Sequence, residues 1–85
     1  MNNLDKLHPG YVLKKEFLEP MNISHEYFSE ETGIPPNDLL EILNCRKEIE
    51  LPVAEQLSRF FGIPEIYWLD LQSQYDEVFR MKIKH

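Results

Sequence analysis

The chain has 85 residues, 42% of them hydrophobic and 28% charged, and it carries a formal net charge of −6. This composition excludes a disordered chain, and the length allows one domain spanning residues 1–85. No apolar stretch approaches the roughly 18 residues of a membrane span, and the N-terminus lacks a secretory pattern, so we expect a cytoplasmic protein.

Apolar residues recur at helical spacing between prolines and glycines, and no segment alternates as a strand would, which predicts an all-α fold with five helices. The first helix is expected from about Gly10 to Glu19. Leu13 and Phe17 lie four residues apart in it, and Pro20 ends it.

The second helix is expected to begin at Ser24, whose hydroxyl can accept a hydrogen bond from the first turn. It ends at Gly33, which we expect in the left-handed conformation. Pro36 is placed to open a third helix, because the first turn needs no N–H there. The apolar stripe of the third helix is Leu39, Ile42 and Leu43.

The fourth helix is expected from Pro52 to Gly62, after a loop over about 44–51. The fifth runs from about residue 65 to residue 82 and is long for so small a domain. The first four helices are expected to supply a complete core, with Trp68 buried against it. We therefore expect the outer part of the last helix to be a dimer interface formed by Leu71, Tyr75, Val78 and Phe79.

Residues 24–44 combine a helix, a tight turn with Gly33 and a second helix, which is the helix-turn-helix arrangement. In this arrangement the second helix enters the DNA major groove. The small Ser29 allows the two helices to pack closely. Any helical hairpin shares a glycine turn, so the pattern alone does not distinguish a DNA-binding unit from another helical hairpin.

Further motifs extend over residues 8 to about 76 in a consistent order. They are His8-Pro9-Gly10, Phe17-Leu18-Glu19-Pro20, Ser24, Gly33-Ile34-Pro35-Pro36, Ile42, Asn44, Arg59-Phe60-Phe61-Gly62, Trp68-Leu69-Asp70-Leu71-Gln72 and Tyr75-Asp76. With these motifs the chain resembles the HigA-type antitoxins, a branch of the lambda-repressor-like (Xre-type) proteins. The resemblance implies a five-helix fold, a homodimer, binding to operator DNA, and neutralisation of a RelE/HigB-like ribonuclease toxin.

The chain departs from this family at residues expected to touch DNA. Asn37 can read adenine or bind phosphate, whereas Asp38 repels phosphate or accepts a hydrogen bond from cytosine. Cys45 stands where the family commonly has glycine, so a left-handed cap there would cost about 1 kcal/mol unless Asn44 adopts it. The candidate DNA-binding residues are His25, Asn37, Asp38, Asn44, Arg46 and Lys47.

The whole net charge lies in residues 21–55, which carry two basic and eight acidic side chains, while both flanking segments are balanced. This segment is either a solvated acidic surface or the docking face for a basic protein such as a RelE-like toxin. The candidate carboxylates are Glu26, Glu30, Glu31, Glu48, Glu50 and Glu55.

Two alternatives to an antitoxin and repressor remain open. The acidic segment opposes attraction to phosphate, which favours a protein-interaction module that has lost operator binding. A solitary helix-turn-helix regulator without a toxin fits the same residues. An enzyme is not expected, since no nucleophile and base form a catalytic pair, and no cofactor is expected. Neither Cys45 nor the histidines His8, His25 and His85 show metal-ligand spacing.

Overall fold

The computed structural model describes residues 3–83, in which the chain is entirely helical and contains no strand. None of the helices in this range is both long and apolar enough to cross a membrane. The elements are the 3₁₀ helix η1 (Asn3–Leu7), α1 (Pro9–Val12), the π-helical segment η2 (Leu13–Leu18), α2 (His25–Thr32), α3 (Pro36–Leu43), α4 (Leu51–Phe61) and α5 (Glu65–Ile83).

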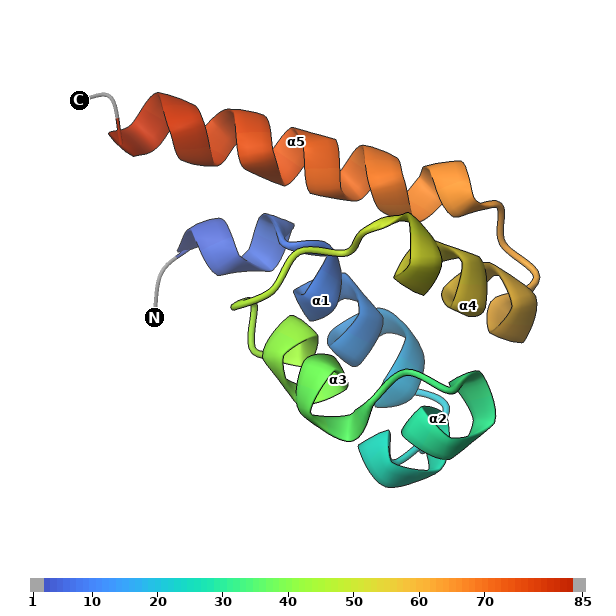
Figure 1. Cartoon of the computed structure of the whole chain (residues 1–85). Coiled ribbons are helices and arrows are strands. Elements are labelled where there is room, and N and C mark those ends of the chain that lie inside the picture. Colours follow the sequence, from blue (N-terminus) through green and yellow to red (C-terminus); the bar gives the residue numbers. More distant parts are fainter. Residues whose placement is uncertain (1–2, 84–85) are drawn as a thin grey trace.

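The long helix α5 lies along one side of the molecule, and η1, α1 and α4 pack beneath it (Figure 1). Helices α2 and α3 lie on the opposite side of this layer, where α2 contacts α4 and α3 contacts α1. The α2–turn–α3 unit is therefore presented on the face of the protein that is remote from α5.

The five predicted helices are confirmed to within one or two residues at nearly every boundary. Ser24 caps α2 by accepting a hydrogen bond from the Tyr27 N–H at 3.2 Å. Gly33 and Gly62 end α2 and α4 with φ values of 80° and 71°. Local chemistry determines these ends, because a cap or a left-handed glycine acts on its own turn.

The first helix differs from the prediction in its second half, where the helix is π-helical. The Glu19 N–H donates to the Lys14 carbonyl at 3.0 Å, an i→i+5 bond that adds one residue to the turn. As a result Leu13 and Leu18, five residues apart, are both buried, at 0% and 3% exposure, whereas Phe17 is only partly buried. The four-residue spacing of the sequence does not reveal this change. The 3₁₀ helix η1 was also not predicted, because it is too short to show a periodic pattern.

The prediction that four helices complete the core is wrong. Trp68 of α5 is fully buried within the core, and its ring lies 5.1 Å from that of Phe17 and 6.3 Å from that of Phe61. The first turns of α5 therefore close the space between η2 and the end of α4. Trp68 is a core residue, as expected, but the core depends on it.

Candidate nucleic-acid interface

The turn between α2 and α3 is held by side chains of α2. The Ser29 hydroxyl, which is buried, donates to the Ile34 carbonyl at 2.6 Å. The Thr32 hydroxyl donates to the Phe28 carbonyl at 2.7 Å and accepts from the Ile34 N–H at 3.2 Å. Ser29 is thus more than a small residue that allows close packing, because these bonds fix the angle at which α3 leaves the turn.

Helix α3 has one buried face and one exposed face. Leu39 and Ile42 are fully buried, which anchors the inner face as predicted. The outer face carries residues spaced three or four apart, as expected for one side of a helix. These exposed residues are Asn37, Leu40, Glu41 and Asn44.

The end of α3 is a left-handed cap formed by Cys45. Asn44 has a φ of −91°, and Cys45 takes the left-handed conformation with a φ of 62°. The Arg46 N–H donates to the Glu41 carbonyl at 2.8 Å, and the Cys45 N–H donates to the Ile42 carbonyl at 3.0 Å. These are the two bonds of a Schellman motif, and they direct the following loop away from the helix. The strain expected for a non-glycine residue therefore falls on Cys45 and not on Asn44.

The predicted DNA-contacting side chains form two groups. Lys47 lies 3.8 Å from Asp38, with both side chains 46% exposed, so this pair joins the start of α3 to the loop that follows it. Arg46 is exposed beside them. His25 opens α2, and its Nε2 atom lies 3.5 Å from the Glu26 carboxylate. Each of these two groups contains both a basic and an acidic side chain.

The loop after α3 is fixed to α5 by a buried glutamine. Gln72 accepts from the Ile49 N–H at 2.7 Å and donates to the Asp76 carboxylate at 3.0 Å. Since Ile49 is itself buried, this contact anchors the loop that carries Arg46 and Lys47. The position of the basic pair therefore depends on the helix at the opposite side of the molecule.

Two residues of this face were not predicted from the sequence. Glu41 lies on the exposed side of α3, and its spacing of four residues from Asn37 could have revealed it. Lys14 of η2 lines a surface hollow together with Asn44 and a second hollow together with His25. No local signal marks Lys14, because Asn44 lies 30 positions further along the chain.

The residues predicted to form the dimer interface are only partly exposed in the single chain. Leu71, Tyr75 and Val78 are half-buried, and Phe79 is 41% exposed. The Tyr75 ring stacks on Phe79 at a centroid distance of 5.8 Å and lies 4.7 Å, edge-on, from the His8 ring. Tyr75 therefore also belongs to the fold of the single chain.

His8 caps α1 and supports the contact with α5. Its Nδ1 atom accepts a hydrogen bond from the Gly10 N–H at 2.9 Å, and the side chain is buried. Burial lowers the pKa of His8, although the carboxylates of Asp5 and Asp76 act in the opposite direction. The neutral imidazole is the form that the fold requires, because a protonated Nδ1 cannot accept.

We expect acid to destabilise the protein through His8. Because the pKa of His8 is lower in the folded chain than in the unfolded chain, neutral His8 contributes fully to the stability of the fold above the unfolded pKa of about 6.5. This contribution is lost as the pH falls through the pKa of His8 in the folded chain. Urea unfolding between pH 7.5 and 5 should show this loss in the wild type. The His8→Asn variant, whose amide oxygen can cap without titrating, should lose the dependence. A control at the half-buried histidine of α2, His25→Gln, should retain it, and an unchanged slope in His8→Asn would contradict the assignment.

No three histidine, cysteine, aspartate or glutamate side chains come together as a metal-binding group within residues 3–83, and His85 lies outside the described residues.

No protein-family profile matches the chain. The chain is 32% identical over 75 residues to virulence-associated protein I of Dichelobacter nodosus, which covers 88% of this chain and 69% of that protein. An addiction module antidote protein of the HigA family from Coxiella burnetii has a similar structure, with a TM-score of 0.83, 33% identity, and coverage of 88% of this chain and 82% of that one. The antitoxin HigA of Pseudomonas aeruginosa, solved with the higBA promoter, gives a TM-score of 0.86 at 26% identity over 89% of this chain and 83% of that one.

Proposed function

Because the chain belongs to the HigA family of helix-turn-helix antitoxins, we propose that it binds the operator of its own operon as a homodimer and neutralises a basic RelE/HigB-like toxin in the cytoplasm. The observation that carries the proposal is the α2–turn–α3 unit, whose outer face is exposed and whose fold matches a HigA protein solved with promoter DNA. HigA antitoxins are binding proteins, and the chain is not an enzyme.

In this proposal α3 enters the major groove, with Asn37 contacting a base edge and Asn44 lying further along the same exposed face. Arg46, Lys47 and His25 then contact backbone phosphates on either side of α3. The 3.8 Å approach of Lys47 to Asp38 supports a role for Asp38 in holding this lysine near the start of α3.

We expect substitutions at this face to separate base contacts from phosphate contacts. Asn37→Ala should weaken binding to the operator by about 1–3 kcal/mol and relax the preference at one base pair. Arg46→Ala should instead weaken binding to all sequences and reduce the slope of log affinity against log salt by about one. Titrations against DNA from upstream of the gene and against random duplex measure both effects.

Asp38→Asn tests the acidic residue of the groove-facing helix in the same titrations. If Asp38 repels phosphate, the variant should bind random duplex more tightly, because Lys47 is also released from its ion pair. If Asp38 accepts from cytosine, the variant should lose affinity for the operator alone. A wild-type protein that prefers no site over random duplex would contradict operator binding and would favour the protein-interaction module, which the acidic residues Asp38 and Glu41 on α3 support.

The acidic segment supports the toxin as second partner. Of its candidate carboxylates, Glu26, Glu30, Glu31, Glu48 and Glu50 are exposed, and Glu55 is half-buried. Attraction between these groups and a basic toxin would mainly increase the association rate. The rate of association with a RelE-like protein encoded beside the gene should therefore fall as salt is added. A rate that does not change with salt would show that these carboxylates do not guide the encounter.

The second copy in the homodimer is proposed to pack on the C-terminal half of α5. In this half Phe79 and Met81 are 41% and 61% exposed, and Val78 is half-buried. Large apolar side chains exposed to water along one helix are unfavourable in a single chain, whereas a symmetric dimer would bury them. Because α5 lies remote from α2 and α3, pairing through it leaves both helix-turn-helix units free (Figure 1).

A further inference from the structure

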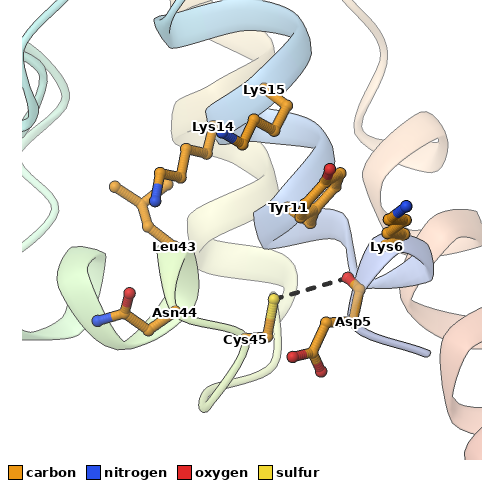
Figure 2. Close-up of a pocket in the computed structure, with 8 residues that line it drawn as sticks. All are labelled: Asp5, Lys6, Tyr11, Lys14, Lys15, Leu43, Asn44 and Cys45. Atoms are coloured by element: carbon orange, nitrogen blue, oxygen red, sulfur yellow. Dashed lines mark hydrogen bonds between the residues drawn. The ribbon is translucent and has the colours of Figure 1, made fainter. Parts of the chain in front are cut away.

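A hollow of about 220 Å³ lies at the edge of the helix-turn-helix unit, between η1, the α1–η2 helix and the end of α3. Figure 2 shows Lys14 extending from the helix toward Leu43 and Asn44, with Cys45 and Asp5 on the opposite wall. The hollow thus joins the N-terminal part of the chain to the last residues of α3, which no sequence motif brings together.

The wall of this hollow is basic in a protein that is acidic as a whole. Lys6, Lys14 and Lys15 all line it, and Asp5 is its one acidic residue. Lys15 is engaged by Glu19, whose carboxylate lies 3.3 Å from the Lys15 Nζ atom. Lys6 and Lys14 form no ion pair with the part of the chain that the structure describes, so their charges remain available to an anion.

A second hollow of about 200 Å³ adjoins the first and continues toward the start of α2. The two hollows share Lys14 and Leu43, and the second reaches Ser24 and His25. Lys14 therefore lies between the start of α2 and the end of α3, which are the two places where the proposed phosphate contacts of the helix-turn-helix unit are found.

We propose that the hollow between η1 and the end of α3 binds one backbone phosphate of duplex DNA, with Lys14 as its main cation. This inference rests on the proposed operator binding and adds a contact from outside the helix-turn-helix unit. An ammonium group binds a phosphate as a point charge, and hydroxyl and amide groups add hydrogen bonds to its oxygens. Lys14 supplies the charge, Lys6 a second one, and Tyr11 and Asn44 the neutral donors.

The first test is the affinity of Lys14→Gln for duplex DNA. Loss of one phosphate contact should reduce the slope of log affinity against log salt by about 0.9 and lower affinity for operator and random duplex by about five- to tenfold at 0.1 M salt. Arg59→Gln is the matched control, because Arg59 is exposed on α4 and lines a separate hollow with Glu31 and Gln56. If the two substitutions have equal effects, Lys14 acts on DNA binding only through the net charge of the protein and not through a phosphate contact. That result would overturn the proposal.

The second test uses Cys45, the only cysteine of the chain, as a reporter inside the hollow. Its thiol donates to the Asp5 carbonyl at 3.7 Å, and burial raises its pKa, so iodoacetamide alkylation is best followed at alkaline pH. Saturating duplex should slow alkylation severalfold in the wild type. Because Lys14 also lowers the pKa of the Cys45 thiol, each complex is compared with its own free protein. In Lys14→Gln the same duplex at saturation should slow alkylation less, relative to the free variant, than it does in the wild type.

The outcomes separate this inference from the proposed function. Duplex that binds without slowing alkylation overturns the phosphate site and leaves operator binding intact. A wild-type protein that binds no duplex overturns both. Protection by inorganic phosphate alone, at a millimolar concentration and as strong as that by duplex, would identify the hollow as a site for free anions and would contradict the assignment to DNA.

Discussion

Gly10→Ala should strongly lower the free energy of unfolding. A Cβ atom built on Gly10 would overlap the carbonyl oxygen of Ile42, so α1 could not remain against α3. The overlapping atom belongs to the backbone of α3, which cannot move aside as the end of a flexible side chain can. We therefore expect the free energy of unfolding to fall by at least about 3 kcal/mol, at the upper end of overpacking effects. This loss is a large share of the roughly 4–13 kcal/mol expected for the unfolding of an 85-residue domain. Urea unfolding followed by circular dichroism measures the change.

Gly62→Ala is the matched control for this substitution. Gly62 has a φ of 71°, but a Cβ atom added there would meet open space. Gly62→Ala should therefore lower the free energy of unfolding only by the strain of the left-handed conformation, about 1 kcal/mol. If Gly10→Ala costs no more than Gly62→Ala, then α1 and α3 can separate slightly at little cost. In that case the close approach at Ile42 does not fix the position of α3.

Phe79→Glu should convert the proposed dimer into a monomer and weaken operator binding by about 100-fold or more, because two linked half-site contacts become one. The side chain is 41% exposed and its one ring contact within the described chain is Tyr75, so the fold of the single chain should survive. Sedimentation at tens of micromolar and a DNA titration provide the two measurements.

Ser73→Glu places the same carboxylate at an exposed position of α5 outside the apolar stripe and should leave both measurements unchanged. A point substitution is preferable to truncation after Gln74. Truncation would also remove Tyr75, which packs on His8, and Asp76, which binds Gln72. A wild-type protein that sediments as a monomer, or a Phe79→Glu variant that remains dimeric, would refute the α5 interface.

Local residues were sufficient to predict α2–α5 and the helix-turn-helix unit, but not η1 or the π-helical segment η2. Ser24, Gly33, Pro36 and Gly62 act on the backbone of their own turn, and such effects are visible in a short stretch of sequence. The inner face of α3 was predictable for the same reason, because Leu39 and Ile42 follow the helical period. The candidate DNA-contacting residues on α3 and after it came from the resemblance and from these positions, and their contacts stay predictions.

The tertiary structure decided which distant residues meet. The packing of Gly10 under Ile42, the pairing of Lys47 with Asp38 and the hydrogen bond from Ile49 to Gln72 each join separate elements. The same holds for Lys14. It reaches the end of α3 only because α1, which continues directly into the segment that carries Lys14, packs against α3. Such contacts depend on the angles at which helices pack, and these angles follow from the shape of the whole core, including Trp68, rather than from the period of any one segment.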